Sequence, residues 1–150
     1  MGDIKYIQIH SWDNHIASAI KGKLNEAGGE VVIKNGNSSF DISYANDESG
    51  ICFATPKGET TVLPWNAFFA AVDILKEKNG KALKGDAAKG KLGSKALPLD
   101  SVEGYVAVNV FGKKKNQEID KNIPKIATIL KWTDIATVGR EYIELKEQYK

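Results

Sequence analysis

The residues that come nearest to a known chemical motif are glycines and lysines in the middle of the chain. Residues 85–91 read Gly-Asp-Ala-Ala-Lys-Gly-Lys and match GxxxxGK, the glycine-rich part of a phosphate-binding loop. Such a loop needs a strand before it and a Ser or Thr after its lysine to hold magnesium. Leu92 stands in that position, and we expect a helix ending at Gly80, not a strand, before the motif. We therefore interpret the match as a chance product of a Lys- and Gly-rich segment.

Residues that could bind metal or act as nucleophiles are few and poorly spaced. The only histidines, His10 and His15, would lie about 140° apart on a helix, which is a poor chelating geometry. Cys52 is the single cysteine and has no basic neighbour close in sequence, so we interpret it as a buried thiol in a reducing compartment. We find no catalytic motif and predict no catalytic residue, metal site or cofactor. A protein that is not an enzyme is favoured, and an enzyme of unfamiliar type with Asp41, His10 or Cys52 in a pocket is left as an alternative.

The distribution of lysine is more informative than any of these motifs. The net charge of +2 divides into −3 over residues 1–64 and +5 over residues 65–150. Seven lysines face two acids between Lys76 and Lys95, and six face two acids between Lys113 and Lys131. Clustered cations favour a polyanionic partner, although they also occur on ordinary soluble surfaces. The length of 150 residues suits one ordinary domain or two very small ones.

The first half of the chain shows the pattern of a helix followed by an antiparallel meander. A short strand is predicted at Ile4–Ile9, and a helix begins at Asp13 and stops at Gly28-Gly29. The helix carries Ile16, Ile20 and Leu24 on one face. Alternating apolar residues between turn signals then predict four strands. These strands cover residues 30–34, 40–44, 51–55 and 60–63.

An amphipathic helix is predicted to follow the meander and to cover its sheet. It opens at Pro64 and carries an aromatic-rich face of Trp65, Phe68, Phe69, Val72 and Leu75. Residues 81–97 are rich in Lys and Gly and are interpreted as a basic loop or linker. The predicted division is therefore a domain over 1–80 and a small one over 98–150, and the sequence leaves open whether the two share one core.

The last third of the chain is predicted to be helical and to end in a hairpin. Residues 98–111 fit both a helix and a strand, and Asp100 or Ser101 followed by Glu103 resembles a helix start. We favour the helix because one helical face would carry Val102, Tyr105, Val106, Asn109 and Val110. A second helix is predicted over 124–135, with Ile126, Ile129, Leu130 and Thr133 inward. Two short strands separated by Gly139-Arg140 complete the chain. The predicted fold class is α+β.

The C-terminal segment resembles the end of a winged helix-turn-helix domain. It reads Ile129-Leu-Lys-Trp-Thr-Asp-Ile-Ala-Thr-Val-Gly-Arg-Glu-Tyr-Ile-Glu-Leu145. In that family a helix runs into a wing, which is a hairpin that closes on an alternating strand. The resemblance places Gly139-Arg140 at the wing tip and implies binding of DNA or protein, with basic residues of the helix and wing on phosphates. The presumed recognition helix, however, carries only Lys125 and Lys131.

A second resemblance concerns the predicted meander and the helix that begins with Pro64-Trp65. This arrangement is similar to the single-stranded-DNA-binding transcriptional coactivators and the Whirly group, which dimerise through the helix and grip a strand on the sheet. The predicted sheet departs from that group because it carries few basic residues, namely Lys34 and Lys57.

The function these patterns favour is non-enzymatic binding of DNA or RNA by a cytoplasmic accessory or regulatory protein. Lysine–phosphate contacts of low sequence specificity would do the binding. The alternative is a protein-interaction or oligomerisation module, such as a homodimer, that uses the aromatic helix face or a sheet edge. No membrane partner is expected. The predicted nucleic-acid-binding residues are Lys84, Lys89, Lys91, Lys95, Lys113, Lys114, Lys115, Lys131 and Arg140.

Overall fold

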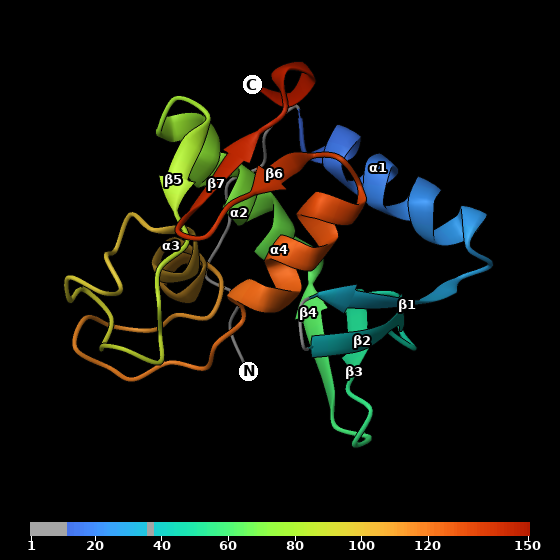
Figure 1. The fold of residues 1–150 in the computed structure, drawn as a ribbon, viewed down its shortest axis with the longest axis horizontal. Coiled ribbons are helices and arrows are strands. Elements are labelled where there is room, and N and C mark those ends of the chain that lie inside the picture. The colour runs from blue at the N-terminus through green and yellow to red at the C-terminus, as the bar shows by residue number, and fades with distance from the viewer. Residues whose placement is uncertain (1–11, 36–37) are drawn as a thin grey trace. The chain divides into compact units, whose positions relative to one another are not determined.

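A computed structural model of the protein describes residues 12–35 and 38–150. The described residues form two compact units, 12–65 and 66–150, which are treated separately below (Figure 1). Both units combine helices with antiparallel sheet, so the predicted α+β class is confirmed. The strand predicted at Ile4–Ile9 and the residue His10 lie outside the described residues. Among the residues described, no helix is both long enough and apolar enough to cross a membrane.

The first unit consists of one helix and a four-stranded meander, as the sequence predicts. Its sheet has the order β1-β2-β3-β4, and each strand is antiparallel to the next (Figure 1). The register is fixed by short turns, since each strand pairs with the one directly before it in the chain. The elements are α1 (Asp13–Glu26), β1 (Glu30–Asn35), β2 (Ser38–Tyr44), β3 (Gly50–Ala54) and β4 (Thr60–Pro64).

Alternation along the strands accounts for the core of this unit. Phe40 and Ile42 of β2, Ile51 and Phe53 of β3, and Leu63 of β4 are buried, while Asp41 and Ser43 are only partly buried. The rings of Phe40 and Phe53 pack edge to face with centroids 5.8 Å apart. The helix contributes one buried stripe at a spacing of four residues. The buried apolar residues are Ile16, Ile20, Leu24, Phe40, Ile42, Ile51, Phe53 and Leu63.

The second unit holds a smaller sheet that is assembled from distant parts of the chain. Its three antiparallel strands have the order β5-β7-β6, with β7 in the middle (Figure 1). The predicted C-terminal hairpin is confirmed as β6 and β7, and α3 settles the ambiguous segment as a helix. The elements are α2 (Trp65–Glu77, which begins at the boundary), β5 (Lys81–Leu83), α3 (Val102–Asn109), α4 (Ile123–Trp132), β6 (Ala136–Val138), β7 (Tyr142–Leu145) and the 3₁₀ helix η1 (Glu147–Tyr149).

Strand β5 was not predicted, because it offers almost no pattern to detect. It has three residues, and only Ala82 among them is buried. Its place is fixed by pairing with β7, and this ladder continues beyond the strand on both sides. The amide of Leu145 donates to the carbonyl of Gly80 at 2.7 Å, and the amide of Lys84 donates to the carbonyl of Glu141 at 2.8 Å.

Residues 84–101 form an irregular segment that has its own small core. Leu92 and Leu97 are fully buried and pack with Ala107 of α3, which is 4% exposed. Half-buried Val108 and Ile119 lie against the same cluster. The segment thus belongs to the second unit. Along the chain, the boundary between the two units falls between residues 65 and 66, whereas the sequence suggested a boundary at 81–97.

Candidate nucleic-acid interface

The two lysine-rich segments of the sequence are joined by backbone hydrogen bonds. The amide of Leu92 donates to the carbonyl of Gln117 at 2.9 Å, and the amide of Asn116 donates to the carbonyl of Leu92 at 2.8 Å. Lys91 and Lys115 therefore flank the same backbone pairing from opposite segments. The aliphatic stem of Lys115 also covers Gly93, where an added Cβ would lie 2.8 Å from Lys115 Cγ.

Six of the predicted binding residues lie on these two paired segments. All six side chains are exposed, so their ammonium groups face solvent. We call this surface the loop platform, and it consists of Lys89, Lys91, Lys95, Lys113, Lys114 and Lys115.

A second group of cations gathers at the end of the small sheet. Lys84 directly follows β5 and is half-buried. Burial lowers the pKa of its ammonium group, and the positive charges of Lys121 and Lys131 lower it further. The three lysines come from three separate segments of the chain. Of these, Lys121 was not among the predicted binding residues, and only the structure reveals its proximity to Lys84.

Backbone hydrogen bonds hold this group together. Besides bonding to Glu141, Lys84 accepts at its carbonyl from the amide of Glu103 at 2.9 Å. The Glu103 carboxylate in turn accepts from the amide of Asn122 at 2.6 Å, directly beside Lys121. Glu141 follows Arg140 in the hairpin turn, and Asn122 follows Lys121. The hydrogen bonds therefore connect the backbone at Lys84 with the residues next to Arg140 and Lys121. We call Lys84, Lys121, Lys131 and Arg140 the sheet-end cluster.

The carboxylate at the centre of this network is buried. Glu103 is 2% exposed, and burial raises the pKa of its carboxyl from 4.5 to about 7. The backbone amides of Asn122 and Ile123, and then the charges of Lys125 and Lys121, act in the opposite direction and lower this pKa. Glu103 thus supplies an acceptor to backbone amides at the start of α4.

The basic surfaces differ from other lysines of the second unit in their pairing with acids, although the charge of Lys121 does act on the buried carboxylate of Glu103. No salt bridge involving the loop platform or the sheet-end cluster occurs in the part of the chain that the structure describes. Other lysines of the second unit do form salt bridges. The Lys78 ammonium nitrogen lies 2.8 Å from a carboxylate oxygen of Asp100, and that of Lys150 lies 3.1 Å from one of Glu144. The basic surfaces are therefore available to an external anion.

Helix α4 contributes little to an exposed interface. Lys131 is its only exposed residue, and most of the helix is buried, including Ile126 and Leu130. Trp132 is half-buried. A helix that reads bases must project several side chains into the major groove. Helix α4 offers no such row of side chains.

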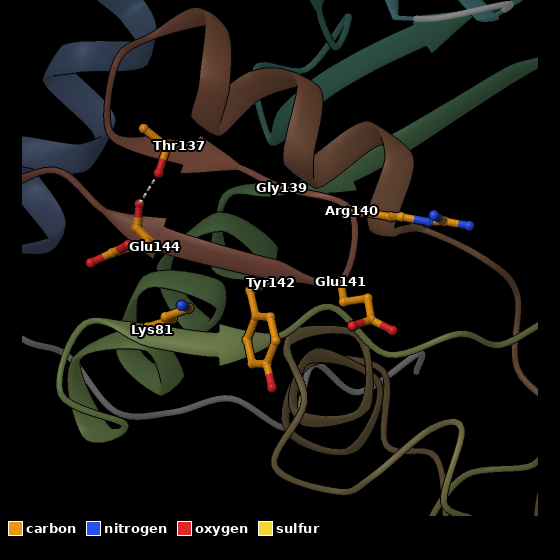
Figure 2. A pocket seen from close by; sticks show the side chains of 7 residues that line it. All are labelled: Lys81, Thr137, Gly139, Arg140, Glu141, Tyr142 and Glu144. Atoms are coloured by element: carbon orange, nitrogen blue, oxygen red, sulfur yellow. Dashed lines mark hydrogen bonds between the residues drawn. The ribbon is translucent and has the colours of Figure 1, made fainter.

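The outer face of the β5-β7-β6 sheet carries a shallow hollow of about 350 Å³. Figure 2 shows Tyr142 and Lys81 beside each other below β7, while the Arg140 side chain extends away from them at the hairpin turn. The residues lining the hollow are Lys81, Thr137, Gly139, Arg140, Glu141, Tyr142 and Glu144.

Other candidates for chemistry find little support in the structure. A strand does precede the GxxxxGK match, contrary to our expectation, but no helix follows it within residues 84–101, so the helix N-terminus of a phosphate loop is missing. No group of three His, Cys, Asp or Glu residues suited to a metal occurs among the described residues. The aromatic helix face is occupied by the core, because Phe68, Val72 and Leu75 are fully buried.

Comparison with known proteins gives no further guide. No family model matches the chain, and neither the curated proteins nor the solved structures provide a match. The winged-helix resemblance therefore stays a prediction, and a function has to be argued from the two basic surfaces.

Proposed function

We propose that the protein binds nucleic acid without catalysis, through lysine–phosphate contacts of low sequence specificity. The observation that carries this proposal is the sheet-end cluster, in which Lys84, Lys121 and Lys131 lie close together beside the hairpin turn of Arg140, with no salt bridge to any of them among the described residues. Bringing like charges together costs free energy, and a phosphate chain placed against them would recover it. Each phosphate neutralised also releases condensed counterions into solution, which is the main source of non-specific affinity.

Low specificity follows from the kind of side chain that is available. Lysine contacts to phosphate fix the position of a nucleic acid but do not distinguish bases. With only Lys131 exposed on α4, the helix cannot supply a base-reading surface. The loop platform would add further phosphate contacts of the same kind.

The order of elements supports a winged-helix-like arrangement of the second unit. Helices α3 and α4 are followed by the β6-β7 hairpin, and β5 pairs with the last strand of the hairpin. In this reading the hairpin is the wing and Arg140 lies at its tip. The connection between the two helices, residues 110–122, is far longer than the short turn of a helix-turn-helix. That connection carries Lys113, Lys114 and Lys115.

The proposal is tested by fluorescence anisotropy with labelled single- and double-stranded DNA at low salt. Replacing Lys121 and Lys131 by Gln is expected to weaken binding about tenfold or more, since two phosphate contacts are lost. The matched control replaces Lys34 and Lys57, two exposed lysines of the acidic first unit, and is expected to leave binding unchanged. Absence of binding by the unaltered protein, or equal weakening by both pairs, would overturn the proposal.

A further inference from the structure

The small sheet has one buried face and one exposed face. Side chains that point inward, such as Ala82 and Ile143, are buried. By the alternation of strands the residues between them must point outward. The outward residues are Lys81, Leu83, Thr137, Tyr142 and Glu144.

Two of the outward residues, Leu83 and Tyr142, form an apolar patch. Leu83 and Tyr142 are directly opposite each other in the β5-β7 ladder, which places their side chains next to one another on the same face. They are 38% and 43% exposed and belong to the few large apolar side chains that the described residues leave open to solvent. An exposed aromatic ring beside an aliphatic side chain is a surface on which a flat ring can stack.

The hollow beside this apolar patch is lined by two cations, Lys81 and Arg140, and by two acids, Glu141 and Glu144. The ammonium nitrogen of Lys81 lies 4.9 Å from the centroid of the Tyr142 ring (Figure 2). Glu144 is the nearest acid of the outward set, and its carboxylate is already paired with Lys150 at 3.1 Å. Arg140 lies at the adjoining hairpin turn, and the amide of Lys84 donates to the carbonyl of Glu141 in that turn. Glu141 remains the one exposed acid at the rim of the hollow.

We infer that the outer face of the β5-β7-β6 sheet binds an unpaired nucleobase, stacked on Tyr142 beside Leu83. This inference rests on the proposed function, because the sheet-end cluster would hold the phosphates of the same strand. A base that stacks here displaces the Lys81 ammonium from the ring toward those phosphates. In a duplex the faces of the bases are covered by their neighbours, so the site selects single-stranded nucleic acid.

The ring of Tyr142 gives the first test. Binding of a labelled single-stranded oligothymidylate and of a duplex of equal length is compared for the protein and three variants. Tyr142→Leu keeps apolar bulk but loses the ring, and is expected to weaken single-strand binding about 5- to 150-fold while leaving duplex binding unchanged. Tyr142→Phe keeps the ring and is expected to bind the single strand as the unaltered protein does. Tyr149→Leu, a half-buried tyrosine in η1, is the control and is expected to have no effect.

A second test needs no variant and so does not depend on folding. An oligonucleotide of abasic nucleotides retains every phosphate but offers nothing to stack. The unaltered protein is expected to bind it about 5- to 150-fold more weakly than the oligothymidylate.

The outcomes separate the two proposals. If the protein binds neither oligonucleotide at low salt, the proposed function fails and the stacking site fails with it. If it binds, but Tyr142→Leu and the abasic strand are bound as tightly as their counterparts, the stacking site alone is overturned. Equal loss in Tyr142→Leu and Tyr142→Phe would also overturn it, because the hydroxyl and not the ring would then be responsible.

Discussion

The two sheets of this protein are built in opposite ways. The sheet of the first unit joins four strands that follow one another in the chain, each paired with its neighbour across a short turn. The sheet of the second unit pairs Lys81 with Glu144, so a strand near the middle of the chain meets a strand near its end. The charges differ as well, since residues 12–65 carry −3 and residues 66–150 carry +5.

This contrast helps to explain why the proposed binding surface lies in the second unit. A meander forms from local contacts, and the outward face of this one carries the exposed side chains of Val32 and Val62. The long-range sheet pairs β5 with β7 and so brings Lys84, which follows β5, to the hairpin turn that holds Arg140. The pairing of β5 with β7 holds Lys84 of the sheet-end cluster in place, so the proposed binding should depend on this more distant contact.

The largest expected effect comes from shortening a buried isoleucine in the middle of either sheet. Ile143 of β7 and Ile42 of β2 are both fully buried, and replacing either by Ala is expected to lower the free energy of unfolding by about 2–5 kcal/mol. Urea unfolding measures this loss. Hydrogen exchange should show the effect of Ile143→Ala in β5 as well, because β5 forms its strand hydrogen bonds with β7.

The contrast between the sheets would be weakened by a different pattern of exchange. If Ile42→Ala exposed the amides of β5 as much as Ile143→Ala does, the two units would unfold as one. The long-range sheet would then not be a separate point of weakness.

The buried carboxylate under the sheet-end cluster should make stability depend on pH. Because the pKa of Glu103 is raised in the folded state, folding takes up a proton between pH 4.5 and about 7. The stabilising contribution of Glu103 is complete below pH 4.5 and is lost as the pH rises through 7. The free energy of unfolding should fall by about 3 kcal/mol in total over this range. Urea unfolding across this range should show the fall, and Glu103→Gln should flatten it.

A matched substitution tests whether the fall belongs to this carboxylate. Asp100→Asn removes an exposed acid whose pKa is lowered by Lys78 and should leave the slope between pH 4.5 and 7 unchanged. A slope that persists in Glu103→Gln would mean that another group titrates.

Glycines in the two units should respond oppositely to alanine. In α3, a Cβ on Gly104 would lie 2.1 Å from the carbonyl oxygen of Pro98, so Gly104→Ala should cost about 1–3 kcal/mol. In α1, Gly22 has nothing within 4 Å, so Gly22→Ala should stabilise by up to about 1 kcal/mol. Thermal melting of both variants checks the pair. A stabilising Gly104→Ala would show that α3 does not approach Pro98 so closely.

The smallest effect is expected at the start of α3. The Ser101 hydroxyl accepts from the amide of Gly104 at 3.0 Å and donates to the carbonyl of Pro98 at 2.6 Å. Ser101→Ala should therefore cost about 1 kcal/mol in thermal melting, as expected for the loss of a helix cap. A Ser101→Ala variant as stable as the unaltered protein would argue against this cap.

The contrast between the sheets also explains what could be predicted from the sequence. The meander, α1 and the C-terminal hairpin carry their information locally, in alternation, turn residues and the spacing of Ile16, Ile20 and Leu24. Strand β5 and the position of Lys121 depend on partners about 40 to 60 residues away, and no local pattern records them. Likewise, Leu92 and Leu97 are isolated apolar residues in the sequence of a predicted linker, and only the structure shows that they pack with Ala107.

The central claim is tested most directly by the salt dependence of binding to single-stranded DNA. If the four cations of the sheet-end cluster contact phosphates, a plot of log Kobs against log salt concentration should have a slope of about −3 or steeper. Removal of Lys121 and Lys131 should reduce the magnitude of that slope by about 1.4. A slope near zero, or a slope that the two substitutions do not change, would contradict the account.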